Sequence, residues 1–139
     1  MTVKTFVDTN ILLYAYDREA GEKHQKARKV VGDLWENNGG VLSAQVLEEF
    51  YVNVTRKIPR PLTKKEGLEL ISHYLSWDTV SIQGGMVAEA AQLEERAKIS
   101  FWDALIVVSA QRSGAQLLLT EDFQAGRKFG ELKVHNPFA

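Results

Sequence analysis

Apolar residues along the chain alternate between short continuous runs and longer stretches with helical spacing. The short runs, which are typical of buried strands, lie in "VKTFVD", "GVLSA", "TVSI", "AQLLLT" and "LKVHN". Helical spacing is found from Lys23 to Asn37 and in "QVLEEFYVNVTRK", "TKKEGLELISHYLSW", "MVAEAAQLEERAK" and "SFWDALIVVSAQRSG". Thr63 precedes Glu66 by three residues, which predicts a capping box. Because strands that alternate with helices form βαβ units, the pattern predicts a three-layer α/β/α domain with a mainly parallel sheet of about five strands.

Acidic residues follow two of the predicted strands directly. Asp8 ends the first strand, and Glu121 and Asp122 come after "LLLT" at the end of the fourth. In α/β folds the functional crevice lies beyond the carboxyl ends of the strands, where the strand order changes direction. These acids are therefore expected at one edge of the sheet. Asp8 or Asn10 can also serve as the N-cap of a following helix.

Three further acids that are candidates for the site lie within predicted helices. Asp103 stands in the apolar segment "FWDALIVV", where a carboxylate needs a partner. Ser100, three residues earlier, offers a structural explanation, a capping box in which Asp103 satisfies the amides of its own helix. Glu48 and Glu49 flank the apolar stripe of their helix about equally, so periodicity does not choose between them, and either can be a solvated surface residue.

Composition limits the chemistry that these acids can perform. The 139 residues suit one domain, with 17 basic and 18 acidic residues, a net charge of -1 and no cysteine. The three histidines lack metal-binding spacing, so clustered carboxylates favour a hard cation, Mg²⁺ or Mn²⁺, over zinc. Binding to nucleic acid would require a local basic patch, for which Arg56, Lys57 and Arg60 are candidates. The longest apolar run, "ALIVV", is too short to span a membrane, and no signal peptide is recognisable, so a cytoplasmic protein is expected.

The motifs "FVDTNILLYAYD", "SAQVLEEFYVNVTRK", "SFWDALIVVSA" and "LLLTEDFQAG", with the closing "VHNPF", resemble those of the PIN-domain ribonucleases. The resemblance is closest to the VapC toxins of type II toxin–antitoxin pairs and covers essentially residues 1–139, as a single PIN domain. It implies a catalytic quartet of acids at Asp8, Glu49, Asp103 and Asp122. It also implies two conserved polar residues, at Asn10 and Thr120. Glu121 and Asp122 are adjacent, and the choice between them as the fourth acid stays open.

The resemblance also implies a mechanism and partners. Asp8 and Asp103 would hold Mg²⁺ or Mn²⁺, and whether a second ion binds near Glu49 and Asp122 stays open. The metal would lower the pKa of a water molecule that attacks an RNA phosphodiester. Similar enzymes cut single-stranded or loop regions of structured RNA. They are neutralised by a small cognate antitoxin and usually form homodimers.

The sequence leaves three alternatives to the nuclease. An aspartate-dependent phosphatase of the haloacid-dehalogenase type needs an acid two residues after its nucleophile, where this chain has Asn10. A receiver-type phosphoacceptor would need a lysine after a late strand, and "LLLTED" has none. A catalytically inactive PIN scaffold that only binds RNA or a partner is the non-enzyme alternative, although all four acidic positions are filled.

Overall fold

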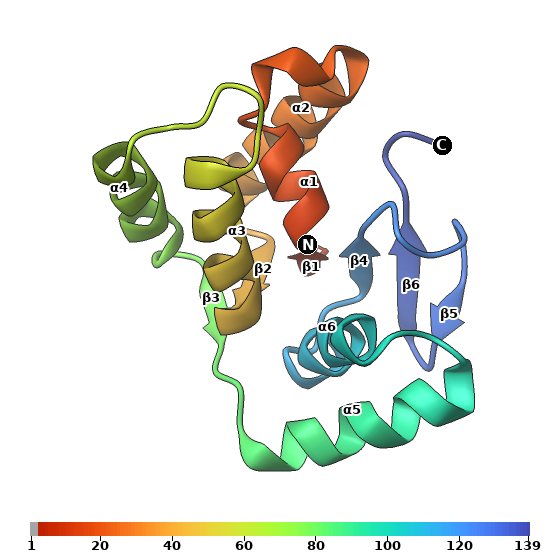
Figure 1. Cartoon of the computed structure of the whole chain (residues 1–139). Coiled ribbons are helices and arrows are strands. Elements are labelled where there is room, and N and C mark those ends of the chain that lie inside the picture. Colours follow the sequence, from red (N-terminus) through yellow and green to blue (C-terminus); the bar gives the residue numbers. More distant parts are fainter. Residues whose placement is uncertain (1–2) are drawn as a thin grey trace.

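The computed structural model describes residues 3–139, along which strands and helices alternate (Figure 1). The strands are β1 (Thr5–Val7), β2 (Gly40–Ser43), β3 (Asp78–Val80), β4 (Leu117–Leu119), β5 (Lys128–Phe129) and β6 (Leu132–His135). The helices are α1 (Thr9–Tyr14), α2 (Glu22–Asn37), α3 (Ala44–Arg56), α4 (Lys64–Tyr74), α5 (Gly84–Ala97) and α6 (Phe101–Arg112), with a 3₁₀ turn, η1 (Arg18–Ala20). The described residues contain no helix long and apolar enough to cross a membrane.

The six strands form one sheet in the order β3-β2-β1-β4-β6-β5. Four of the five strand pairs are parallel, and only β5 with β6 is antiparallel. The chain moves outward from β1 to β3 and then crosses back to place β4 on the other side of β1. The strand order therefore changes direction at β1, and a crevice is expected beyond the carboxyl ends of β1 and β4.

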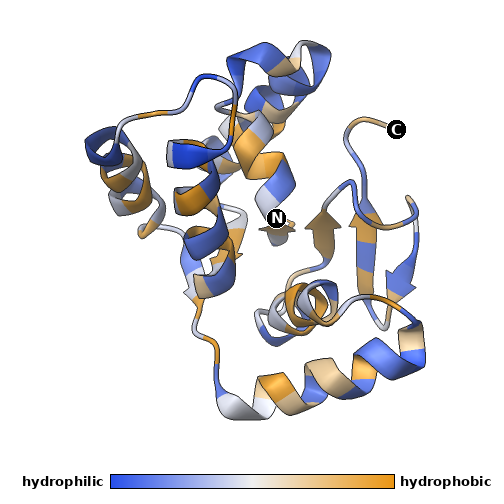
Figure 2. Ribbon diagram, in the orientation of Figure 1, coloured by the Kyte–Doolittle hydropathy of each residue, from blue (hydrophilic) through white to orange (hydrophobic). Residues whose placement is uncertain are grey.

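The helices form two groups that cover the sheet. In one group, α1 packs against α2 and α3, and α3 packs against α4 (Figure 1). In the other group, α5 packs against α6. Because βαβ crossovers are right-handed, the reversal at β1 puts these groups on opposite faces. Helix α6 is apolar around most of its surface, and every residue from Ala104 to Ala110 is buried (Figure 2). The predicted three-layer α/β/α arrangement is confirmed.

The sequence pattern predicted most elements but missed three short ones. The predicted capping box at the start of α4 is complete, since Thr63 and Glu66 each accept a backbone hydrogen bond from the other. Helix α5 begins at Gly84, two residues before its apolar stripe. Helix α1, the turn η1 and the two-residue strand β5 were absent from the predicted pattern, although Asp8 was a candidate cap for a helix where α1 begins. With β5 the sheet has six strands rather than about five.

A glycine at the start of β2 allows a close approach between the sheet and an aromatic ring. Gly40 is buried, and a Cβ atom at this position would overlap the indole ring of Trp77. We expect Gly40→Ala to lower the free energy of unfolding by about 1–3 kcal/mol, the usual cost of overpacking. Chemical denaturation followed by circular dichroism measures this change.

Gly32 supplies the matched control for this substitution. It lies within α2, and a Cβ atom there would meet nothing within 4 Å. Gly32→Ala should raise the free energy of unfolding by about 0.5–1 kcal/mol, because alanine is the better helix former. Equal effects of the two substitutions would contradict the role assigned to Gly40.

Candidate active site

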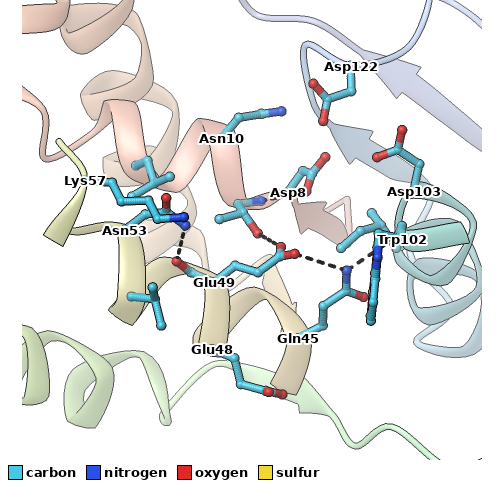
Figure 3. A pocket seen from close by; sticks show the side chains of 14 residues that line it. Asp8, Asn10, Gln45, Glu48, Glu49, Asn53, Lys57, Trp102, Asp103 and Asp122 are labelled. Carbon is cyan, nitrogen blue, oxygen red and sulfur yellow. Dashed lines mark hydrogen bonds between the residues drawn. The ribbon is translucent and has the colours of Figure 1, made fainter. Parts of the chain in front are cut away.

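A cavity of about 540 Å³ lies beyond the carboxyl ends of β1 and β4, where the strand order changes direction. Its walls come from α1, α3, α6 and the loop that follows β4 (Figure 3). Five acidic residues line it, namely Asp8, Glu48, Glu49, Asp103 and Asp122. The fold thus brings together acids that are separated by more than one hundred positions in the sequence.

Asp8 is the most buried of these acids and is held at both carboxylate oxygens. It is 4% exposed, and its Oδ1 accepts a hydrogen bond from the backbone N–H of Thr9 at 2.7 Å. Its Oδ2 accepts a hydrogen bond from the hydroxyl of Thr120 at 2.8 Å. Asp8 is also the N-cap of α1, so capping and membership of the site are compatible.

Burial raises the pKa of Asp8 from 3.8 to about 7. The hydrogen bonds from Thr120 and Thr9 lower this pKa, and the nearby charges of Asp122 and Asp103 raise it further. Figure 3 shows these three carboxylates directed toward a common space. Partial burial, followed by the charges of Asp103 and Glu121, also raises the pKa of Asp122. The carboxylates therefore destabilise one another in their charged forms.

Glu121 and Asp122 are adjacent but face different surroundings. The Oε1 of Glu121 accepts hydrogen bonds from the hydroxyl of Tyr14 and the ammonium of Lys23, each at 3.2 Å. Asp122 lines the cavity, and its backbone N–H donates to Thr120 Oγ1 at 3.0 Å. Asp122 is therefore the residue of this pair that the structure places beside Asp8.

Glu48 and Glu49 also differ in what they contact. Glu49 is half-buried, and its Oε1 accepts a hydrogen bond from the hydroxyl of Thr9 at 2.7 Å. Gln45, one helical turn earlier, places its Nε2 3.5 Å from Glu49 Oε2. Glu48 is exposed at the rim and points away from the other acids (Figure 3). The distinction that periodicity left open is thus made by a neighbouring helix, α1.

The capping-box explanation of Asp103 is only half right. Ser100 is the N-cap of α6 and accepts a hydrogen bond from the Asp103 N–H at 3.0 Å. Within residues 3–139, however, no hydrogen bond returns from the Ser100 backbone to the Asp103 carboxylate. The Asp103 side chain is half-buried and lines the cavity instead. Its carboxylate thus lies in the cavity with those of Asp8 and Asp122 (Figure 3).

The site residues offer oxygen atoms to a hard cation. As the side chains are placed, residues 3–139 contain no group of three or more acidic, histidine or cysteine side chains that could hold an ion. The donor chemistry nevertheless fits, because a cation would offset the repulsion between the carboxylates of Asp8, Asp103 and Asp122. Asn10 adds a buried Oδ1 atom that has no hydrogen-bond partner among residues 3–139.

Several residues of the cavity were not identified from the sequence, and three of them contact or adjoin the acids. Thr9 connects the end of β1 to Glu49, and Gln45 contacts both Glu49 and the Trp102 backbone. The four-residue spacing of Gln45 and Glu49 on one helix was a usable signal for that pair. Trp102 lines the cavity with an exposed ring, and its only signal was its position next to Asp103.

Comparison with known proteins identifies a family and a set of similar folds. The PIN domain family matches residues 5–128. None of the curated proteins matches the chain significantly. A crystal structure of Mycobacterium tuberculosis VapC20, described as a sarcin-ricin loop cleaving toxin, has a TM-score of 0.63 at 19% identity, and the match covers 83% of this chain and 87% of that one.

Two complexes are similar at the level of fold. A toxin–antitoxin complex from Klebsiella pneumoniae contains a chain with a TM-score of 0.70 at 19% identity, covering 96% of this chain and 98% of that chain. VapBC2 from Rickettsia felis, bound to a DNA fragment from its promoter, has a TM-score of 0.66 at 19% identity. The match again covers 96% of this chain and 98% of that one. At this identity the likeness establishes the fold.

The raised pKa of Asp8 predicts that stability depends on pH in metal-free buffer. Because the folded pKa of about 7 lies above the ordinary value of 3.8, the folded protein holds this proton more tightly than the unfolded chain. The resulting stabilisation is fully present below about pH 3.8 and is lost as the pH rises through 7. The free energy of unfolding, measured with urea in the presence of EDTA, should be higher near pH 5 than near pH 8 by on the order of 2 kcal/mol.

Asp8→Asn is the control for this pH dependence. The amide keeps the shape of the side chain and does not titrate, so the variant should lack this part of the pH dependence. The difference between the two proteins isolates Asp8 from other titrating groups. Parallel stability curves for the wild type and the variant would show that the buried carboxyl does not titrate as described.

Proposed function

The chain belongs to the PIN domain family, and we propose that it is a VapC-like toxin, a metal-dependent ribonuclease that hydrolyses RNA phosphodiester bonds. The observation that carries the proposal is the cavity at the reversal of the strand order, into which four separate segments bring Asp8, Glu49, Asp103 and Asp122. Buried, mutually repelling carboxylates are a costly arrangement that a bound divalent cation would stabilise.

The four acids divide between metal binding and proton transfer in the proposed reaction. Asp8 and Asp103 would hold Mg²⁺ or Mn²⁺, which when bound lowers the pKa of water and offsets charge on the phosphoryl group. Thr9 and Thr120 each donate a hydrogen bond to one oxygen of Asp8, so its carboxylate would lose little conformational freedom on binding an ion. Glu49, held by Thr9 at Oε1, would orient the attacking water and accept its proton. The phosphorus–oxygen bond to the leaving nucleotide breaks, and that oxygen takes up a proton from solvent. Asp122 adds negative charge for the same ion or a second one.

Binding of RNA at an acidic cavity requires nearby positive charge. Lys57 is exposed and lines the cavity, so it is the basic residue best placed to contact a phosphate. Arg56 is exposed beside it at the end of α3. Arg60 is exposed but lies 3.6 Å from the carboxylate of Glu19, which engages part of its charge. We therefore assign the main phosphate contact to Lys57.

The proposed partners are a cognate small antitoxin and a second copy of the chain. The similar folds from Klebsiella pneumoniae and Rickettsia felis belong to toxin–antitoxin complexes, which supports an antitoxin as partner. An RNA substrate places the proposed activity in the cytoplasm. Light scattering of the chain, alone and mixed with the product of an adjacent short gene, tests both partners, and a monomer unaffected by that product would contradict them.

The proposed function predicts RNA cleavage that depends on a divalent metal. Purified protein should cleave total RNA with Mg²⁺ or Mn²⁺ present, and excess EDTA should abolish cleavage because the carboxylates then lack their counter-charge. The same ions should raise the melting temperature of the wild type near pH 8, and raise that of Asp8→Asn less. Binding of RNA without cleavage in either metal would favour the inactive scaffold, and cleavage that persists in EDTA would exclude the metal mechanism.

The adjacent glutamates of α3 supply a matched pair of variants for this assay. Glu49→Gln should reduce the single-turnover rate by about 100-fold or more, as expected for loss of a general base. Glu48→Gln changes the same charge on the same helix but should leave the rate within about twofold, because its side chain points away from the other acids. Loss of activity in Glu48→Gln alone would reverse this assignment.

Lys57 should contribute to RNA affinity through its charge. Lys57→Gln should weaken binding and reduce the slope of log affinity against log salt by about 0.7, the value for one contact to single-stranded nucleic acid. Lys29→Gln, a change on the exposed surface of α2, is the control. Fluorescence anisotropy with labelled oligouridylate over a range of salt concentrations gives both slopes. An unaltered slope for Lys57→Gln would remove this residue from the RNA-binding surface.

A further inference from the structure

Trp102 differs from the other two tryptophans of the chain. Trp35 and Trp77 pack against the ring of Tyr74, each with ring centroids 5.0 Å apart. Trp102 is 61% exposed, although it lies on the rim of the cavity that contains the acids. An indole left in water contributes little of its large apolar surface to folding. Its position is therefore not explained by packing of the core.

The exposed ring is nevertheless attached to a fixed support. The Trp102 carbonyl accepts a hydrogen bond from Gln45 Nε2 at 3.3 Å, and Gln45 is only 6% exposed. The Trp102 ring packs edge-on against Phe101, with centroids 5.2 Å apart and an interplanar angle of 81°. Trp102 directly precedes Asp103 in the first turn of α6 (Figure 3). The indole is thus held at a defined place beside the acids while most of it stays accessible.

We propose that Trp102 is a substrate-positioning residue whose indole stacks on a nucleobase of single-stranded RNA beside the phosphate that reacts. This inference rests on the proposed ribonuclease function and assigns to that site a contact with the base. Stacking on an aromatic ring needs neither charge nor a particular base, because every base has a π face. Such a contact suits a site whose acids repel the RNA backbone and whose chain has a net charge of -1.

The inference is tested by binding of a short fluorescein-labelled oligouridylate in the presence of Mg²⁺, with Asp8→Asn as background to prevent cleavage. Adding Trp102→Leu, which keeps an apolar side chain but removes the aromatic ring, should weaken binding about 5- to 150-fold. Adding Trp102→Phe should retain most of the affinity. The slope of log affinity against log salt should not change in either, because stacking displaces no counterion.

A probe without bases separates stacking from an indirect structural effect. A ribose-phosphate oligomer of the same length should bind more weakly than oligouridylate to protein with Trp102, and the difference should shrink in Trp102→Leu. Leu68→Ala removes an equally exposed apolar side chain, 60% exposed on α4 and outside the cavity, and should change neither affinity. Circular dichroism of each variant checks that the fold is kept.

The outcomes distinguish this inference from the proposed function. If the wild type cleaves RNA and Trp102→Leu binds oligouridylate as tightly as its parent, the stacking role is wrong and the nuclease stands. The same conclusion follows if Trp102→Leu alters only the oligomeric state, which would place the ring in a protein interface. If the wild type neither binds nor cleaves RNA with Mg²⁺ or Mn²⁺, the proposed function fails and the stacking role fails with it.

Discussion

The buried carboxylate of Asp8 joins the segments on which the candidate site depends. The backbone N–H of Asp8 donates a hydrogen bond to the Leu119 carbonyl at 2.9 Å, which continues the pairing of β1 with β4. Its two side-chain oxygens accept hydrogen bonds from Thr9, at the start of α1, and from Thr120, at the end of β4. The Thr120 hydroxyl in turn accepts from the Asp122 N–H. One side chain therefore sets the positions of α1 and of the loop that carries another acid.

This arrangement is costly to the folded protein, and the surrounding core supports it. A carboxylate removed from water beside two others favours its protonated form, as the pKa of about 7 expresses. The residues before and around it are strongly buried, including Phe6, Val7 and most of α6. Functional sites commonly keep such local destabilisation when the rest of the fold is stable enough to tolerate it. The acids of this cavity are better explained by binding than by stability.

The sequence predicted the parts of this protein that depend on local pattern. The long helices and the main strands have periodic apolar residues, and acids at strand ends could be assigned to one edge of the sheet. Helix α1 has only six residues and β5 only two, too few for a periodicity to be recognised. Glu121 contacts Lys23, which lies 98 positions away in the sequence, whereas Asp122 lines the cavity. Such contacts follow from the fold and not from local sequence.

Gln45 connects the two functions assigned to opposite walls of the cavity. Its amide nitrogen lies 3.5 Å from Glu49 Oε2, on its own helix, and 3.3 Å from the Trp102 carbonyl, on α6. The proposed proton acceptor and the proposed base platform therefore share one support. A substitution at Gln45 would disturb both and could not assign an effect to either. The indole of Trp102 lies beyond this hydrogen bond, which involves only its backbone. Its ring can therefore be changed while the support of Glu49 is kept, so base contact and chemistry are separable at this residue.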